Sequence, residues 1–168
     1  MKKLVVLFAI LLSSFGFSQN MNNDKLQEIY TSVSDSIQGK LGAWQFKVEN
    51  VQLISISDKT HNRMRIISPI ADVNSISDEL LKAAMVANFH SALDVKYAIT
   101  DGVLWSVFTH PLKELSEDQV RDALSQVYYA NVNFGSSFAS SSLTFPAANK
   151  GDKEPEKKTK PVFKKKKV

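Results

Sequence analysis

VKYAITDGVLWSVFT, the stretch Val95–Thr109, decides the fold of this chain. Runs rich in β-branched and aromatic residues flank Asp101-Gly102. Asp-Gly favours a two-residue type I′ turn, because both turn positions need a positive φ. The stretch therefore predicts a β-hairpin in which Thr100 pairs with Val103.

The predicted hairpin has two apolar faces. The alternation of a strand directs one set of side chains toward a core, namely Val95, Tyr97, Ile99, Leu104 and Phe108. The opposite face carries Val103, Trp105 and Val107, and it is too apolar to be left in water without a reason. We expect this second face either to pack beneath residues 134–145 of the same chain or to bind a second molecule.

The N-terminal residues have the features of a secretory signal peptide. Two lysines precede the apolar run Leu4–Leu12, and the small residues Gly16 and Ser18 fit a cleavage site before Gln19. The run is too short to span a bilayer as a stable helix, and a retained anchor is the alternative. We therefore expect residues 1–18 to be removed and the protein to be exported to the periplasm or the outer envelope. With no cysteine in the chain, disulfides and thiolate metal sites are excluded.

The formal charge of +4 is unevenly distributed. Residues 1–18 hold two lysines and residues 150–168 hold nine lysines against three carboxylates, so the rest of the chain has a net charge of −4. Residues 147–168 form a lysine-rich tail that we expect to be disordered, because it cannot bury enough apolar surface to offset its ordering entropy. Its cluster of Lys164, Lys165, Lys166 and Lys167 is a candidate site for an anionic lipid, an anionic glycan or an acidic protein, and a solvated tail is the alternative. The acidic body argues against nucleic acid as a partner.

Residues 19–146 predict a single α+β domain. Helical spacing of apolar residues and strand-like runs alternate along the chain. The expected helices are Asp24–Gln38, Ser77–Ala92 and Glu117–Asn131, and the expected strands before the hairpin are Ala43–Glu49, Val51–Ser57 and Arg63–Ile70. The predicted fold is an antiparallel β-sheet, a meander plus the hairpin, with about three helices in the order α-β-β-β-α-β-β-α. We expect Ser77–Ala92 to be the best buried helix, because more than half of its circumference is apolar.

The sequence carries no pattern typical of catalysis or metal binding. His61, His90 and His110 lack a metal-binding spacing, and the acidic pairs at 78–79 and 117–118 suit helix starts. No serine lies in a Gly-x-Ser-x-Gly motif, and no glycine-rich phosphate loop occurs. We therefore expect no enzyme activity, no cofactor and no bound metal.

Several stretches resemble the type III secretion chaperone-like fold, the group of Tir-type chaperones and YbjN-type proteins. The similarity covers about Asp24–Phe134 and is carried by Leu80-Leu81 through Ala87-Asn88-Phe89, by Tyr97–Trp105, by His110-Pro-Leu and by Leu115 through Gln126-Val127. The resemblance implies a non-enzymatic domain that often forms homodimers and holds extended segments of a partner protein on its sheet and helix surfaces. The signal peptide, which ends Phe-Ser-Gln, resembles those of Bacteroidetes envelope proteins.

These features together predict an exported protein-interaction module, chaperone-like or adaptor-like. It would bind a partner protein through Val103, Trp105 and Val107, and an anionic surface or partner through its tail. The alternative is a periplasmic protein that binds a small apolar ligand in a cavity between the sheet and the helix Ser77–Ala92, lined by Met85, Phe89 and Tyr97. An uncovered Trp105 favours the first hypothesis, and a deep cavity favours the second.

Overall fold

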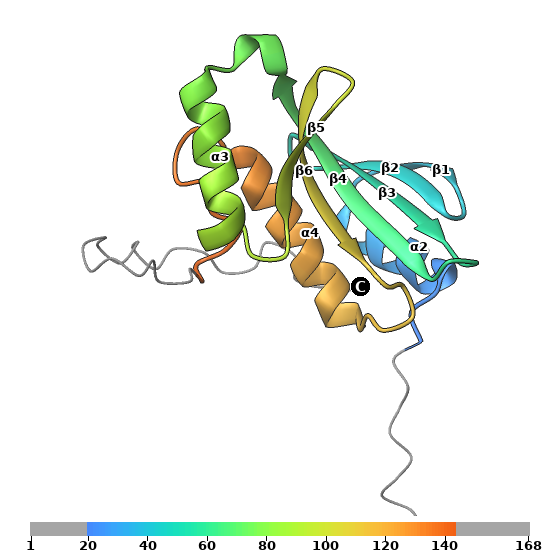
Figure 1. Cartoon of the computed structure of the whole chain (residues 1–168). Coiled ribbons are helices and arrows are strands. Elements are labelled where there is room, and N and C mark those ends of the chain that lie inside the picture. Colours follow the sequence, from blue (N-terminus) through green and yellow to red (C-terminus); the bar gives the residue numbers. More distant parts are fainter. Residues whose placement is uncertain (1–19, 144–168) are drawn as a thin grey trace, which may run out of the picture.

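Six strands form one antiparallel sheet in the order β1-β2-β3-β4-β6-β5 in the computed structural model, which describes residues 20–143 (Figure 1). The strands are β1 (Ile37–Lys40), β2 (Ala43–Val48), β3 (Val51–Asp58), β4 (Arg63–Asp72), β5 (Lys96–Thr100) and β6 (Val103–His110). The helices are α2 (Asn23–Val33), α3 (Asp78–His90) and α4 (Glu117–Val132), with a short 3-10 helix η1 (Val73–Ser75) before α3. The predicted α+β class and antiparallel sheet are confirmed.

The β5–β6 hairpin is built as its sequence predicts. Asp101 and Gly102 have φ values of 51° and 74°, and Thr100 pairs with Val103 across the turn. β6 also pairs with β4, so it lies inside the sheet, between β5 and β4. The two faces of the hairpin are therefore continuous with the two faces of the whole sheet.

The first helix is shorter than predicted, and a strand follows it. α2 ends at Val33, and β1 begins at Ile37 and pairs with β2. Ile37 continues the helical spacing of apolar residues, but the intervening Ser-Asp-Ser favours turns over helix interiors, and Ile37 pairs with Phe46 in the sheet instead. Gly39 has a φ of 112°, and a Cβ there would lie 2.2 Å from the carbonyl oxygen of Ala43, so the close approach of β1 to β2 requires glycine.

α2 and α4 cover the same face of the sheet and form the core with it. The Tyr30 hydroxyl on α2 lies 2.7 Å from the Ser55 hydroxyl on β3. The Ser106 hydroxyl on β6 donates to the carbonyl of Val127 on α4, at 3.1 Å. Ser55 and Ser106 are fully buried, and these short side chains let the helices approach the sheet while pairing its buried polar atoms.

α3 is not the best buried helix, contrary to the expectation for Ser77–Ala92. Only Ala84 and Ala87 are buried on it, whereas burial along α4 is far more extensive. Figure 1 shows α3 beside the edge strand β5, away from the centre of the sheet. Ala84 and Ala87 are buried and Leu81 packs against the core, whereas Met85, Val86 and Phe89 are exposed, because no second layer of the described chain lies over them.

Asn88 fastens α3 to the edge of the sheet. Its side-chain oxygen accepts the backbone N–H of Tyr97 at 2.7 Å, and its amide nitrogen donates to the carbonyl of the same residue at 3.1 Å. The Lys96 ammonium donates to the carbonyls of Asn88, at 2.9 Å, and of Leu93. The side chain of Asn88 thus makes the two backbone hydrogen bonds at Tyr97 that a neighbouring strand would otherwise make. Lys96 donates hydrogen bonds to carbonyls at the C-terminal end of α3.

Candidate functional site

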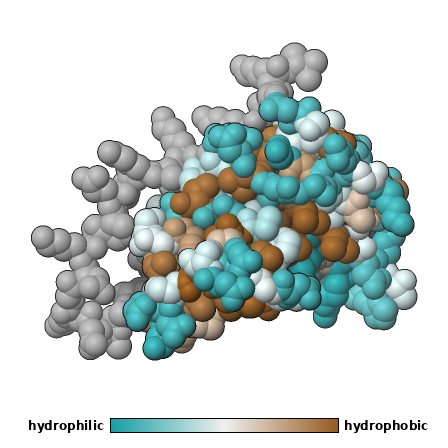
Figure 2. Space-filling model, turned by 90° about the horizontal axis from the view of Figure 1, so that it is seen from above, coloured by the Kyte–Doolittle hydropathy of each residue, from teal (hydrophilic) through white to brown (hydrophobic). Residues whose placement is uncertain are grey.

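The face of the sheet opposite α2 and α4 is apolar. The register aligns Ile54, Ile67 and Val107 in one row across β3, β4 and β6. Ile56 is 49% exposed, and the larger of the other apolar side chains on this side are half-buried. Figure 2 shows hydrophobic side chains gathered across one side of the molecule, with polar ones between them. We call this set the open face: Ala43, Ile54, Ile56, Ile67, Pro69, Ala98, Val103, Trp105 and Val107.

Trp105 is the largest side chain of the open face. It pairs with Ala98 on one side and with Pro69 on the other. Its indole Nε1 is shielded from solvent and has no hydrogen-bond partner among the described residues. The exposed part of this half-buried side chain is therefore its apolar ring surface, and the indole N–H points away from solvent.

The segment after α4 docks on the other side of the sheet from Trp105. The rings of Phe134 and Phe138 lie 5.7 and 6.1 Å from the ring of Tyr97. The Tyr97 hydroxyl donates to the carbonyls of Ala130, at 2.8 Å, and of Phe138, at 3.3 Å. Tyr97 belongs to the core side of β5. Residues 134–143 therefore do not cover the open face. The expectation that the face with Trp105 packs beneath residues 134–145 is wrong for residues 134–143, and residues 144–145 lie outside the described residues.

Basic side chains flank the open face. The register places Lys40 and Arg65 in one row with Ala43 and Ile56, across β1 to β4. No ion pair within residues 20–143 joins any of the basic side chains on this face to a carboxylate. The basic side chains on this side are Lys40, Lys47, Arg63, Arg65 and Lys96.

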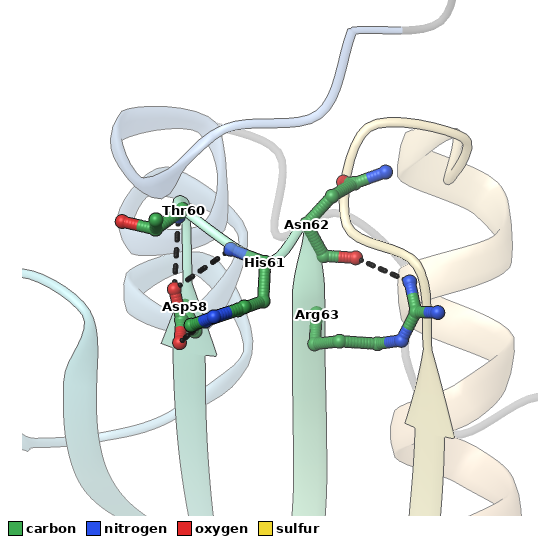
Figure 3. A network of polar contacts seen from close by, with 5 residues as sticks. All are labelled: Asp58, Thr60, His61, Asn62 and Arg63. Atoms are coloured by element: carbon green, nitrogen blue, oxygen red, sulfur yellow. Dashed lines mark hydrogen bonds and ion pairs between the residues drawn. The ribbon is translucent and has the colours of Figure 1, made fainter.

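The carboxylates on this side lie at strand ends and bind neighbouring turns. Asp58, at the end of β3, accepts the N–H groups of Thr60 and His61 at 2.8 and 3.0 Å, and lies 2.6 Å from the His61 ring nitrogen Nδ1 (Figure 3). The side-chain hydrogen bond with His61 is the main cause that lowers the pKa of Asp58. Asp72, at the end of β4, accepts the N–H of Asn74 at 2.8 Å. The charge on this side that is not neutralised by an ion pair within residues 20–143 is therefore positive, and it surrounds the apolar row.

Arg63 and Arg65 differ in their surroundings. Arg63 donates to the carbonyl of Asn62 at 2.9 Å (Figure 3). The hydrogen bonds from the Asn62 side chain are the main cause that lowers the pKa of Glu114, and the charge of Arg63 is a smaller one. Arg65 makes one hydrogen bond, from Nε to the Thr109 hydroxyl at 3.2 Å. Arg63 is thus engaged by its own loop, whereas Arg65 is held toward the open face.

A second exposed apolar surface lies on α3 and β5. Phe89 is 79% exposed, and Met85, Val86 and Ile99 are each more than half exposed. We call these four residues the α3 surface. Four large apolar side chains gathered at one edge of a domain are more typical of an interaction surface than of scattered exposure.

The predicted cavity for a small apolar ligand is not formed by the residues expected to line it. Met85 and Phe89 point outward on the α3 surface, and the Tyr97 hydroxyl is engaged by α4 and the segment that follows it. Two of the three residues expected to line the cavity are thus exposed at the surface and do not enclose a ligand.

No cluster typical of metal chemistry occurs in the described part of the chain. Residues 20–143 contain no group of three or more His, Asp or Glu side chains able to hold a metal ion. No helix among them is long and apolar enough to cross a membrane. Lys164, Lys165, Lys166 and Lys167 lie outside the described residues.

The sequence placed Val103, Trp105 and Val107 on one face of their strand, as the register shows, but did not predict most of the surface around them. The structure brings Ile54 and Ile67 into the same apolar face from two other strands. Strand alternation alone could have indicated that each of these side chains lies on one side of its own strand. The register between β4 and β6 could not be deduced from a local turn, because these strands are not consecutive in the chain.

Solved structures of type III secretion chaperones share this fold. No family model and no curated protein sequence matches the chain. The chain is similar to a chain of the HopA1–SchA chaperone–effector complex, with a TM-score of 0.51 and 12% identity over 68% of this chain and 89% of that one. It is also similar to a chain in the structure of the Yersinia pestis type III secretion chaperone SycH in complex with a stable fragment of YscM2, with a TM-score of 0.52 and 13% identity over 67% of this chain and 98% of that one. The type III secretion chaperone-like fold that the sequence resembles is therefore confirmed.

Proposed function

We propose that this chain, which has the type III secretion chaperone-like fold, is a non-enzymatic module that binds a segment of a partner protein on its open face, in the manner of a chaperone or adaptor. The observation that carries the proposal is the open face itself. Its apolar row of Ile54, Ile67 and Val107 lies next to Trp105, which is two residues from Val107 on the same side of β6. No helix of residues 20–143 lies over the open face (Figure 1). The fold supports the proposal, since the two similar solved structures described above are complexes of a chaperone with another protein.

Replacing Trp105 with serine is expected to abolish most partner recovery. Truncating a large aromatic at the centre of an interface removes about 2 kcal/mol or more of binding free energy, which corresponds to a loss of affinity of about thirtyfold or more. The measurement is a pull-down from an envelope extract with the full chain as bait, with the captured proteins quantified by mass spectrometry. Equal recovery by wild type and variant would count against the open face.

Two further variants separate binding from folding. Ile56→Ser truncates an open-face side chain that is 49% exposed, so it should weaken recovery with little effect on stability. Leu41→Ser is the matched control, because Leu41 is equally exposed, at 51%, but lies in the β1–β2 turn. Recovery should be unchanged with Leu41→Ser, and an equal loss in both variants would show that exposed apolar surface in general, and not the open face, captures the proteins.

We also propose that the chain forms a homodimer through its α3 surface. Met85, Val86 and Phe89 lie on a single helix at the edge of the domain. Such a helix can pack antiparallel on its own copy, because a two-fold interface brings the same patch of each subunit together. The open face stays free in this arrangement, so each subunit retains its proposed binding surface.

We propose that the mature protein is exported and that Lys164–Lys167 tether it to an anionic surface or partner, for which the charge of the cluster is the support. Each lysine close to an anionic membrane contributes roughly 1 kcal/mol. Deletion of the residues after Ala148 should therefore abolish cosedimentation with vesicles that contain anionic lipid at low salt. Wild-type binding should also fall as salt is raised, and a tail deletion that binds these vesicles as well as wild type would contradict the tether.

A further inference from the structure

We infer that the partner segment is acidic as well as apolar, and that one of its carboxylates pairs with Arg65. The inference rests on the proposed function and deepens it by naming the chemistry of the partner. It follows from three features of the open face: its unneutralised positive charge, the geometry of Arg65 and the apolar row beside that residue.

The guanidinium of Arg65 is oriented but not neutralised. Its Nε donates to the Thr109 hydroxyl at 3.2 Å, and no ion pair joins it to a carboxylate among residues 20–143. Guanidinium groups bind carboxylates through two parallel hydrogen bonds. A side chain already held by one neutral hydrogen bond loses less conformational entropy when it forms such a pair. Arg65 is therefore prepared for an incoming carboxylate.

Apolar side chains lie directly beside Arg65. Arg65 pairs with Ile56 on β3, and Ile67, two residues along β4 on the same side, pairs with Ile54 and Val107. A segment that places a carboxylate on Arg65 therefore meets the row of Ile54, Ile67 and Val107 with its neighbouring side chains. The matching partner is an extended segment that presents apolar side chains and at least one Asp or Glu on the same face.

The same surface does not suit single-stranded nucleic acid. Such sites stack successive bases on several aromatic side chains. The open face has one aromatic residue, Trp105, and its other large members are aliphatic. Charge complementarity together with aliphatic surface favours an acidic protein segment.

Three labelled synthetic peptides test this inference with the full chain. They share a valine-rich and threonine-rich sequence and differ only in one residue of the valine face, which is Glu, Gln or Lys. The Glu peptide is expected to bind about tenfold or more tightly than the Gln peptide, since a charge-assisted pair is stronger than a neutral hydrogen bond. The Lys peptide should bind most weakly. Affinities are measured by fluorescence anisotropy, with an oligothymidylate as competitor.

Arg65→Gln and Arg63→Gln form a matched pair on the same strand and the same face. Arg65→Gln should remove the preference for Glu over Gln, whereas Arg63→Gln should retain it because Arg63 is engaged at Asn62. All variants keep the lysine-rich tail, so the tail attracts a given peptide equally in each of them, and the difference in Glu preference between Arg65→Gln and Arg63→Gln reports on Arg65. A Glu preference that is as large with Arg65→Gln as with Arg63→Gln overturns the inference, and so does displacement of the Glu peptide by oligothymidylate.

The outcomes also distinguish this inference from the proposed function. If the Glu and Gln peptides bind equally and both lose affinity with Trp105→Ser, the open face binds protein segments but does not select acidic ones. If no peptide binds in a manner that depends on Trp105, the proposed function fails together with the inference.

Discussion

Replacing Tyr30 with alanine is expected to lower the free energy of unfolding by about 3–5 kcal/mol, the range for truncating a large buried aromatic. Tyr30 is fully buried between α2 and the sheet. Its ring stacks on Phe46, with centroids 4.7 Å apart, and meets Trp44 edge-on at 5.3 Å. The substitution therefore loses the free energy gained by moving the aromatic ring from water into the core, leaves a cavity and breaks two aromatic contacts. The measurement is equilibrium unfolding in urea, followed by circular dichroism.

Tyr30→Phe separates the hydroxyl from the ring. The Tyr30 hydroxyl is the hydrogen-bond partner of the fully buried Ser55 hydroxyl, so its loss should cost about 1–3 kcal/mol. Adding Ser55→Ala to Tyr30→Phe should recover part of this loss, because the unpaired hydroxyl is then gone as well. A loss of less than about 1 kcal/mol for Tyr30→Ala would contradict the assignment of this cluster to the core.

The sequence predicted those parts of the fold that local chemistry decides. Asp101-Gly102 specifies its turn through the φ values of two adjacent residues, so the hairpin and its register follow without knowledge of the rest of the chain. Ser116 and Gln119 likewise form the capping box that starts α4. Such signals act over a few residues, and distant packing does not change them.

The rest of the fold depends on contacts that local patterns do not contain. Helical spacing continues to Ile37, yet this residue joins β1, because pairing with Phe46 is available only once β2 is in place. The apolar residues around α3 indicate how much of its surface could be buried. They do not indicate whether another helix or strand packs against that surface. Phe89 therefore belongs to the apolar pattern of the predicted helix but is exposed in the structure.

The candidate site was predictable only in part for the same reason. Alternation placed Trp105 on the second face of its hairpin, and the structure leaves that face without a covering helix within residues 20–143. The cationic character of the face arises from Lys40, Lys47 and Arg65, which lie on three different strands. These residues lie on the same face only because of the strand order, which cannot be read from the composition. The net charge of the chain between residues 19 and 149 is negative, so it gives no sign of a basic face.

Phe89→Glu is expected to convert a homodimer into a monomer. Phe89 is 79% exposed in the single chain, and in the proposed dimer it packs against the α3 surface of the second copy. A carboxylate buried there without a partner costs several kcal/mol, so dimerisation should weaken about a hundredfold or more. Sedimentation equilibrium of the wild type and the variant, both at micromolar concentration, measures this change.

Ile56→Glu is the matched control for Phe89→Glu. It introduces the same charge at an exposed apolar position, but on the open face, and should leave the dimer intact. Neither variant should change the stability of the folded monomer by more than about 0.5 kcal/mol, because both positions are exposed before association. A monomeric wild type would refute the dimer. Dissociation by Ile56→Glu and not by Phe89→Glu would instead assign self-association to the open face, which would then be occupied by a second copy and closed to any other partner.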